Sequence, residues 1–394
     1  MKILMINVVC GIRSTGRICT DLATALEAQG HEVKIAYGRE NVPKQFQKYA
    51  VRVGSDLDVK LHGVKARLFD AAGFGSKIAT RHFIKWIKEY DPDVIHLHNI
   101  HGYYINIEVL FDYLKTCGKK IIWTLHDCWA FTGHAAYCEA ADCERWMTGC
   151  ERCPKKNDYP KSLSDRSKCN WKQKKDIFSD MPNLQIVTPS KWLAELVKKS
   201  FLSQYPVTVI YNGIDTDVFK PTQSNLREQL NLGNKNVILG VAAVWDERKG
   251  LSDFIELSEK LDNTKYQIIL VGLSKKQIDS LPSEIIGIAK TDSVQQLVQL
   301  YSLADVFVNP TYEDNYPTTN LEAIACGTPV ITYNTGGSPE SARMYGAVVE
   351  KGNIEQLAAA IETIQIVDVL PTQLPEGNIP KYLHLILQND SGLI

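Results

Sequence analysis

Short apolar segments alternate with helical segments along most of this 394-residue chain, and no other feature constrains its fold as strongly. Such segments suit strands that are buried on both faces, as in parallel sheets covered by helices on each side. The sequence therefore predicts an α/β fold. Strands are expected at residues 2–9, 31–37, 93–98, 120–126, 184–188, 207–211, 237–242, 267–271, 285–288, 305–308 and 330–333.

The strands form two series, and a chain of this length usually forms two domains. We predict a Rossmann-like N-terminal domain over residues 1–205, a Rossmann-like C-terminal domain over 206–375 and a tail over 376–394. The hinge is expected between Asn212 and Thr222. Open parallel sheets bind ligands at the carboxyl ends of their strands, so polar residues that follow strands are the candidates for a site facing a central cleft.

One acidic segment, residues 313–322, places carboxylates in a loop and at the start of the helix that follows it. Asp314 and Glu322 lie at either end of a loop that turns into a helix, with Pro317 in the first turn and Gly327 just past the end. A helix N-terminus favours anions, so two acids around it can grip hydroxyls on either side of a bound diphosphate. The alternatives are a helix N-terminal acid with an unrelated surface acid, or the acid pair of a glycoside hydrolase.

Basic and imidazole side chains also follow predicted strands. Arg248 and Lys249 follow the first strand of the second series, where two cations would neutralise a departing diphosphate. His126, with Asp127, ends another strand, where an imidazole can donate to a substrate hydroxyl or phosphate. Gly16 follows the first strand and lets the main chain approach a ligand. A solvated basic pair, a structural histidine and a helix cap are the respective alternatives.

Four cysteines form a C-x4-C-x6-C-x2-C pattern: Cys138, Cys143, Cys150 and Cys153. The last pair has the spacing of half a zinc knuckle, whereas the first pair is loosely spaced. A structural zinc site and a set of plain thiols are equally supported, and redox chemistry is a third alternative. Four thiolates would leave no open coordination position, so a catalytic zinc is not expected.

Charge is unevenly distributed along the chain. Residues 1–200 carry 31 Lys and Arg against 22 Asp and Glu, and the remainder carries 13 against 23. A basic N-terminal half suits an anionic partner such as a membrane surface, although chance differences between domains are the alternative. Between Lys60 and Lys88, basic residues are interleaved with apolar ones, including Trp86. This pattern is typical of a helix in a membrane interface, or of an ordinary helix on a sheet.

We expect a cytoplasmic protein, at most in contact with the inner face of the membrane. The first apolar run, residues 2–9, is too short for a signal peptide. No apolar run reaches the roughly 18 residues that span a bilayer. The cysteines are then expected to be reduced, and a nucleic-acid partner is not expected.

The assembled residues resemble those of the retaining family 4 glycosyltransferases, which have the two-domain GT-B fold. The resemblance covers residues 1 to about 365 and rests on segments 320–330 and 211–215, on Arg248-Lys249-Gly250-Leu251 and on Thr124-Leu125-His126-Asp127. It implies that the N-terminal domain binds the acceptor and the C-terminal domain the nucleotide-sugar. Family members commonly end with a helix that crosses back to the first domain, and residues 381–387 are the candidate for it. Residues 123–134 are similar to a subset active in exopolysaccharide, capsule or colanic-acid synthesis. The family often has Glu where Asp314 stands, and Gly-Arg where Ala243, Val244 and Trp245 stand, so Arg248 is expected to supply the missing cation.

The resemblance implies a role for each matching residue. Glu322 would hold ribose hydroxyls, and Asp314, or alternatively Glu313, would contact the donor sugar. Arg248 and Lys249 would bind the diphosphate. The other implied positions are His126 at the reacting carbon, Gly16 at the β-phosphate, Ile288 near the base, and Asn315, Tyr316, Pro317 and Thr318 along the sugar and diphosphate.

By this resemblance, the chain would move a sugar from a nucleoside diphosphate-sugar to a glycan or lipid-linked oligosaccharide acceptor, with retention and without a catalytic metal. The alternatives are a nucleotide-sugar epimerase of the same fold and a non-catalytic subunit that binds sugar nucleotides or glycans. An epimerase would need no acceptor, whereas a binding subunit would have no use for both His126 and Lys249.

Overall fold

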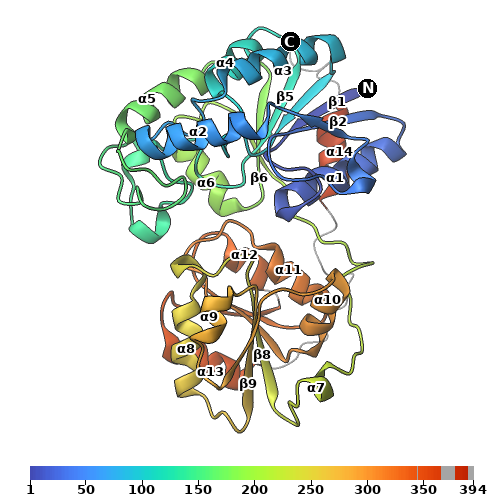
Figure 1. The fold of residues 1–394 in the computed structure, drawn as a ribbon, viewed down its shortest axis with the longest axis vertical. Coiled ribbons are helices and arrows are strands. Elements are labelled where there is room, and N and C mark those ends of the chain that lie inside the picture. Colours follow the sequence, from blue (N-terminus) through green and yellow to red (C-terminus); the bar gives the residue numbers. More distant parts are fainter. Residues whose placement is uncertain (344, 365–377, 389–394) are drawn as a thin grey trace. The chain divides into compact units, whose positions relative to one another are not determined.

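A computed structural model describes residues 1–343, 345–364 and 378–388. The chain divides into two compact units, which are described separately (Figure 1). Unit 1 comprises Met1–Tyr211 and Asn378–Ile394, and unit 2 comprises Asn212–Gly377. The acceptor and donor roles of the two predicted domains stay predictions. Of the predicted tail, residues 378–388 are described, and they belong to unit 1.

Unit 1 is built on a parallel sheet of seven strands in the order β3-β2-β1-β4-β5-β6-β7. Strand β1 pairs with β2 on one side and with β4 on the other, so the order reverses at this strand. Polar residues that follow β1, β4 and β5 therefore lie at one edge of the sheet. The strands are β1 (Lys2–Ile6), β2 (Glu32–Tyr37), β3 (Ala50–Arg52), β4 (Val94–Leu97), β5 (Lys120–Thr124), β6 (Leu184–Thr188) and β7 (Val207–Val209).

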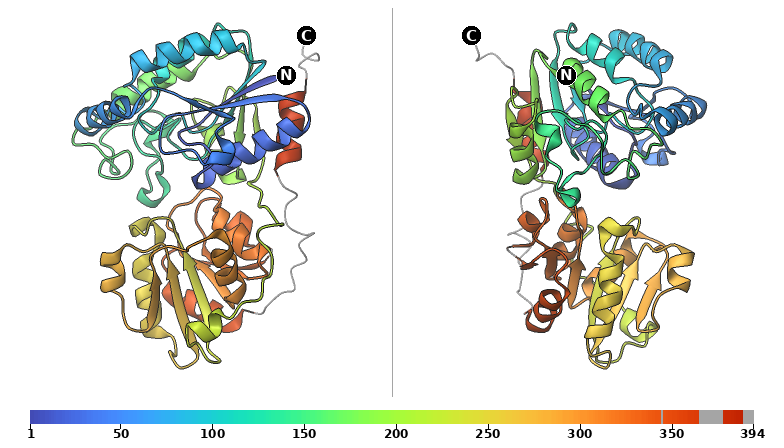
Figure 2. Two further views of the ribbon diagram at one scale, coloured as in Figure 1. Left: turned by 45° about the vertical axis from the view of Figure 1, so that its right-hand side comes forward. Right: turned by 90° about the vertical axis from the view of Figure 1, so that its left-hand side faces the viewer.

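Helices cover both faces of this sheet, as Figure 2 shows from two sides. Apolar residues of α3, α4, α5 and α6 share one core cluster, and those of α1 and α14 share the other. The helices are α1 (Arg13–Ala28), α2 (Asp56–Phe69), α3 (Lys77–Tyr90), α4 (Ile107–Leu114), α5 (Ser167–Phe178), α6 (Lys191–Lys199) and α14 (Ile379–Leu387). Short 3-10 turns lie at η1 (Lys44–Phe46), η2 (Glu139–Ala141) and η3 (Arg145–Met147).

Helix α14 comes from the far end of the chain and packs on unit 1. Its inner side chains, Tyr382, Leu385 and Ile386, are buried. The hydroxyl of Tyr382 hydrogen-bonds that of Thr124 on β5 at 3.1 Å. These contacts hold a segment more than 250 residues away in sequence against the carboxyl end of β5.

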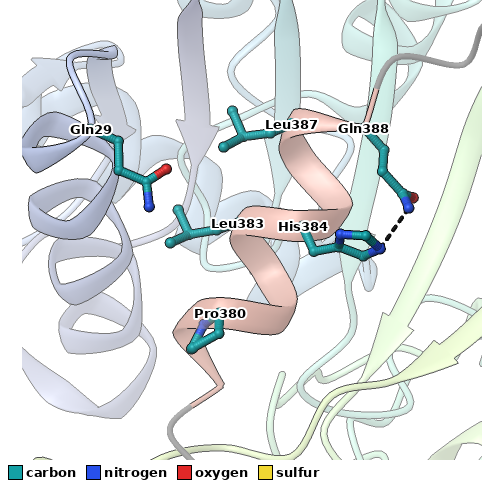
Figure 3. A pocket seen from close by; sticks show the side chains of 6 residues that line it. All are labelled: Gln29, Pro380, Leu383, His384, Leu387 and Gln388. Carbon is teal, nitrogen blue, oxygen red and sulfur yellow. Dashed lines mark hydrogen bonds between the residues drawn. The ribbon is translucent and has the colours of Figure 1, made fainter.

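The outer side of α14 borders a hollow of about 430 Å³ against helix α1 (Figure 3). Leu383 and Leu387 point from α14 toward Gln29, and Gln388 hydrogen-bonds His384 within the same helix. None of the predicted site residues lines this hollow.

Unit 2 has a parallel sheet of six strands in the order β10-β9-β8-β11-β12-β13. Its strands are β8 (Asn236–Val241), β9 (Tyr266–Val271), β10 (Ile285–Ile288), β11 (Val306–Asn309), β12 (Val330–Tyr333) and β13 (Gly346–Val349). One face packs on α8, α9 and α13 and the other on α7, α10, α11 and α12. The helices are α7 (Leu226–Gln229), η4 (Glu247–Lys249), α8 (Leu251–Lys260), α9 (Lys275–Asp279), α10 (Val294–Leu303), α11 (Thr318–Ala325), α12 (Ser338–Ala342) and α13 (Ile354–Thr363).

The predicted class, two α/β domains with parallel sheets, is confirmed. Each strand expected from the sequence is present, with ends that differ by up to three residues. Two short edge strands, β3 and β13, were missed because Ala50–Arg52 is a three-residue segment and Gly346–Val349 begins with a glycine. Both gain their strand conformation from a single neighbouring strand.

Candidate active site

Two loops at the carboxyl edge of the unit 2 sheet meet around Asp314. One follows β8 and contains Arg248 and Lys249 in η4, and the other follows β11. The guanidinium of Arg248 donates to the main-chain carbonyl of Glu313 at 2.8 Å. The amide of Tyr312 donates to the carbonyl of Arg248, also at 2.8 Å. The two cations and the acid, which are about 65 residues apart in sequence, are thus brought together by the fold.

Asp314 and Lys249 form an ion pair, with 2.5 Å between Oδ2 and Nζ. Both side chains are largely buried, with 14% and 18% exposed. Burial alone would raise the pKa of Asp314, but the charges of Lys249 and Arg248 outweigh it and hold the pKa below its usual range. The second oxygen of Asp314 accepts the amide of Asn315 at 2.9 Å. The acid is therefore a carboxylate at neutral pH, held beside two cations.

Glycines allow the close approach of these loops. Gly336 has a φ of +57°, and a Cβ there would lie 1.9 Å from the carbonyl oxygen of Asp314. Gly250 has a φ of +69°, and its Cβ would lie 2.3 Å from the carbonyl oxygen of Pro310. Neither position can hold a side chain without moving main chain. The loop that contains Asp314 therefore packs directly on the main chain at Gly336, which follows β12. The loop that contains Lys249 packs directly on the main chain at Pro310, which follows β11.

Helix α11 begins directly after this acidic loop. Pro317 is its N-cap and Thr318 its first residue, whereas the sequence predicts Pro317 within the first turn. The helix therefore begins one position later than predicted. Asn315 and Tyr316 are buried, and the carbonyl of Tyr316 accepts from the side chain of Asn212 at 3.2 Å. The N-terminus of this helix carries positive partial charge close to the two cations. The loop and the N-terminus of α11 together form a site that favours anions.

Glu322 lies on α11 and is 3% exposed. Its carboxylate accepts the hydroxyl of Tyr301 from α10 at 2.9 Å. Ile288 ends strand β10, and its carbonyl accepts the amide of Gly272 at 2.9 Å. The predicted contacts of Glu322 with ribose and of Ile288 with a base stay predictions.

In unit 1, His126 follows β5, as expected, and pairs with a second histidine. His98, which follows β4, lies with its Nδ1 3.0 Å from Nε2 of His126, and the two rings are stacked. Burial lowers the pKa of His126 to about 4, and lowers that of His98 as well. Both imidazoles are therefore neutral at pH 7, with one nitrogen donating to the other. His126 can act there as a hydrogen-bond donor or acceptor but not as a cation.

Asp127 belongs to a second chain of hydrogen bonds at the same edge. Its Oδ2 lies 3.0 Å from Nε2 of His101, and Nδ1 of that ring lies 3.1 Å from the hydroxyl of Tyr159. Burial raises the pKa of Tyr159, so the phenol stays protonated and donates to His101, which in turn donates to Asp127. The other oxygen of Asp127 accepts the amide of Trp129 at 2.9 Å. This carboxylate is therefore oriented from both sides.

A buried lysine holds the loop that follows Asp127. Lys174 on α5 donates to the carbonyls of Trp129 at 2.7 Å and Thr132 at 3.1 Å, and its ammonium lies 3.5 Å from the centre of the Trp129 ring. Burial is the main cause that lowers the pKa of Lys174 to about 7 from 10.5. The loop is therefore anchored by a group close to losing its charge at neutral pH.

The free energy of unfolding of unit 1 is expected to rise with pH from about 7 to about 8.5, below the range in which unfolded cysteine thiols ionise, by up to about 1.4 kcal/mol per pH unit. In this range the unfolded Lys174 binds a proton that the folded one does not, whereas below about pH 7 the full cost of burying the charge is present. Urea unfolding followed by tryptophan fluorescence reports on this unit, because six of the seven tryptophans lie in it. Lys174→Met should flatten the slope, whereas Lys172→Met, an exposed change on the same helix, should retain it. An equal slope in both variants would contradict the assignment.

Gly16 lies in the first turn of α1, which begins at Arg13. Its carbonyl accepts the amide of Gly11 at 3.1 Å, and a Cβ there would lie 3.1 Å from Val9. The glycine is thus explained in part by packing within unit 1. Its predicted contact with a β-phosphate stays a prediction.

The four clustered cysteines are all reduced in the structure. Burial raises the pKa of Cys150 and of Cys153 to about 11, so both are thiols at neutral pH, and Cys150 accepts the amide of Gly133 at 3.2 Å. Among the described residues, no group of three or more His, Cys, Asp or Glu side chains is arranged to hold a metal ion. A structural zinc at Cys138, Cys143, Cys150 and Cys153 stays a prediction that metal analysis of the purified protein would test.

Sequence reasoning missed several residues at these edges. His98 and His101 follow β4 just as His126 follows β5, so the same strand-end rule would have found them. Lys174 and Gly336 carry no such signal, because their partners are main-chain carbonyls brought close only by the tertiary structure.

Comparison with known proteins agrees with this architecture. Residues 15–218, more than half of the chain, match the model of Glycosyltransferase Family 4, and residues 222–366 match that of Glycosyl transferases group 1. The chain is a family 4 glycosyltransferase. One relative is an Escherichia coli (strain K12) protein provisionally named colanic acid biosynthesis glycosyl transferase WcaC, 25% identical, with 86% of this chain and 85% of that protein aligned. Another, the processive diacylglycerol alpha-glucosyltransferase of Acholeplasma laidlawii, is 29% identical over 37% of this chain and 47% of its own length.

Solved structures show the same GT-B fold for this glycosyltransferase. Sucrose-phosphate synthase from Thermosynechococcus elongatus superposes with a TM-score of 0.67 and 19% identity, covering 92% of this chain and 88% of that one. Anabaena HepE in complex with UDP gives a TM-score of 0.62 and 16% identity, covering 98% and 95%. The predicted fold class is confirmed by these neighbours.

Proposed function

We propose that this glycosyltransferase moves a sugar from a nucleoside diphosphate-sugar to a hydroxyl of a lipid-linked oligosaccharide in bacterial surface polysaccharide synthesis, with retention at the anomeric carbon. One observation carries the proposal: Arg248 and Lys249 converge with Asp314 at the N-terminus of α11. Cations and a helix N-terminus suit a diphosphate, and the adjacent carboxylate suits sugar hydroxyls.

The relatives support the same class of substrates. HepE has been solved with UDP and with UDP-glucose. The name of the Escherichia coli relative refers to colanic acid, a polysaccharide, and that of the Acholeplasma relative to a diacylglycerol acceptor. The lipid-linked acceptor and the surface-polysaccharide product are extended from these names to this chain as part of the proposal.

In the proposed reaction, the bond between the anomeric carbon and the diphosphate oxygen breaks, and the acceptor hydroxyl bonds to the same face of that carbon. The departing diphosphate takes the proton of the hydroxyl. Lys249, Arg248 and the amides of α11 stabilise the negative charge that grows on the diphosphate. The ammonium of Lys249 is paired with Asp314 in the loop that precedes α11. A bound diphosphate would compete with Asp314 for this ammonium. No catalytic metal is part of the proposal, and turnover in the presence of a chelator would test this.

The proposal is tested by measuring nucleoside diphosphate release with purified protein, a nucleotide-sugar donor and a lipid-linked acceptor extract. Release that requires the acceptor, with labelled sugar recovered in the lipid fraction, supports transfer. Interconversion of the donor without acceptor would identify an epimerase, and binding without either reaction would identify a non-catalytic subunit. Both of these outcomes contradict the proposal.

Nucleotide-sugar donors are expected to raise the apparent melting temperature, because ligands that bind only the folded state stabilise it by mass action. At a ligand concentration one hundred times its Kd, the stabilisation is about 2.7 kcal/mol. A thermal-shift panel of UDP-, GDP- and dTDP-sugars measures this effect and identifies the base. Inorganic phosphate at equal ionic strength is the control, and a panel without any shift would count against a nucleotide-sugar site.

A further inference from the structure

Two tyrosine rings lie together at the carboxyl edge of the unit 1 sheet, apart from the residues that the proposed reaction assigns to the donor. Tyr103 belongs to the loop that follows β4, and Tyr159 belongs to the loop between β5 and α5. Their ring centres are 6.3 Å apart, and their planes are inclined at 58°. Tyr159 is 45% exposed and Tyr103 is half-buried. The two rings therefore form an accessible aromatic corner, at the same edge of the sheet as His126.

The hydroxyl of Tyr159 has a fixed direction of hydrogen bonding. Asp127 is a carboxylate, because hydrogen bonds and nearby imidazoles hold its pKa below the usual range despite its burial. A carboxylate can only accept, so Nε2 of His101 donates to it across 3.0 Å. In the neutral imidazole, Nδ1 then accepts the phenolic proton of Tyr159 across 3.1 Å. The phenolic oxygen is left with lone pairs only, so it recognises a ligand group that donates, such as a sugar hydroxyl.

A half-buried arginine lies beside both rings. Arg39 follows β2, and its guanidinium carbon lies 6.0 Å from the centre of the Tyr103 ring. Its charge also reaches the phenol of Tyr159, where it opposes the burial that raises the pKa. Among the residues that the structure describes, no carboxylate is paired with Arg39, whereas Arg13, at the same edge, is paired with Glu40 at 2.6 Å. A half-buried guanidinium of this kind suits an anionic group of a ligand.

The main chain at Tyr103 is strained. Its φ is +72°, a left-handed conformation that is unfavourable for a bulky side chain. The neighbouring Tyr104 is buried and donates to the carbonyl of Asn99 at 2.8 Å, which fixes the loop. The loop of Arg39 packs directly on it, because a Cβ at Gly38 would lie 2.0 Å from that of Tyr104. Strain that the surroundings maintain in this way is typical of binding sites.

We propose that Arg39, Tyr103 and Tyr159 form a subsite for a sugar ring of the acceptor that carries an anionic group. The C–H groups of a sugar have partial positive charge and pack on the negative face of an aromatic ring. A hydroxyl of this sugar donates to the oxygen of Tyr159, and Arg39 pairs with the anionic group. The inference rests on the proposed function, since it names the chemistry of the acceptor in that reaction.

The anionic group can come from two sources with one chemistry. It is either the carboxylate of an acidic sugar or the phosphate that joins a glycan to its lipid carrier, because a guanidinium pairs with both through parallel hydrogen bonds. None of the described helices is long and apolar enough to cross a bilayer. The excess of basic residues over residues 1–200, 31 against 22, favours either anion. A glucuronide and a sugar phosphate represent the two sources on one sugar ring.

Ligand-observed NMR of the full-length chain tests the proposal with methyl glucuronide, glucose 1-phosphate and methyl glucoside as probes. An excess of UDP keeps the sugar phosphate out of the proposed donor site. At least one anionic probe should bind about tenfold more tightly than methyl glucoside, and the tighter of the two identifies the source of the anion. Tyr159→Phe, which removes only the phenolic oxygen, should weaken binding of that probe about fivefold. Arg39→Gln should remove the preference for anionic probes.

Arg52→Gln and Tyr113→Phe are the matched controls and should bind every probe as the parent does. Arg52 also lies over a tyrosine ring, 5.9 Å from the centre of Tyr37, but it is paired with an acid, and Tyr113 is a phenol on α4. Equal affinity for all probes, no binding of any probe, or unchanged affinity in Arg39→Gln and Tyr159→Phe would overturn the proposal. The donor-induced rise in melting temperature should be the same in every variant, because none of the changed residues belongs to the predicted donor site. A failure of the subsite is therefore distinguishable from a failure of the proposed reaction.

Discussion

Replacing Lys249 by alanine is expected to lower the rate of sugar transfer by about 10²–10³-fold, while the chain stays folded. A cation that stabilises charge on a leaving group contributes most in the transition state, and losses of this size follow removal of one such group. The variant also leaves Asp314 without its closest cation, but Arg248 remains beside it. The stability cost is therefore expected to stay within about 2 kcal/mol. Initial rates with the preferred donor and a melting curve measure the two effects.

Lys260 provides the matched control, since it also pairs with an acid, Glu355, at 2.7 Å, but on the surface of the same unit. Lys260→Ala should change neither rate nor stability measurably. If the Lys249–Asp314 pair were purely structural, replacing both residues together, by Lys249→Met and Asp314→Leu, would restore activity along with stability. Recovery of full turnover in this double variant would falsify the catalytic assignment.

Gly336→Ala is expected to destabilise unit 2 by about 3 kcal/mol or more and to reduce transfer strongly. A positive φ alone costs a residue with a side chain about 1–2 kcal/mol. The new Cβ would also lie 1.9 Å from the carbonyl oxygen of Asp314, so main chain must move. For a unit of this size the melting temperature should fall by roughly 6–12 °C. Differential scanning calorimetry and the transfer assay measure the two consequences.

Gly233 separates the conformational cost from the overlap. Its φ is +56°, close to that of Gly336, but nothing lies within 4 Å of the added Cβ. Gly233→Ala should therefore cost about 1–2 kcal/mol and leave transfer unchanged. If both variants lose the same stability and retain the same activity, the contact between Gly336 and the loop of Asp314 has no part in shaping the site.

Much of the candidate site was predictable because its signals are local. Residues that directly follow parallel strands gather at one edge of the sheet, and this rule found His126, Lys249 and Asp314. The same rule extends to His98 and His101, which the sequence interpretation passed over. The end of helix α11 was also predictable from local sequence. Gly327 follows α11 with a φ of +85°, as its place after a helix predicts.

Burial and pairing were not predictable in this way. The pKa of His126 falls because of the atoms packed around it, and the amphipathic pattern near Lys60 was attributed to both α2 and α3. Periodicity shows that a helix has an apolar face but not whether that face meets the core or the outside. The structure distinguishes the two helices. The apolar residues of α3 pack in the core, whereas Leu57, Leu61, Val64 and Leu68 of α2 are exposed.

The sequence by itself determined the two series of strands, the class of fold, the family resemblance and the polar residues at the strand ends, because each depends on spacing within about a dozen residues. Only the tertiary structure decided that Lys249 pairs with Asp314, that Lys174 anchors the loop after Asp127, that Gly336 packs on the acidic loop and that α2 is apolar outward. The three contacts join residues 22 to 65 positions apart along the chain. Their partners are fixed by how whole elements pack, which no local pattern encodes.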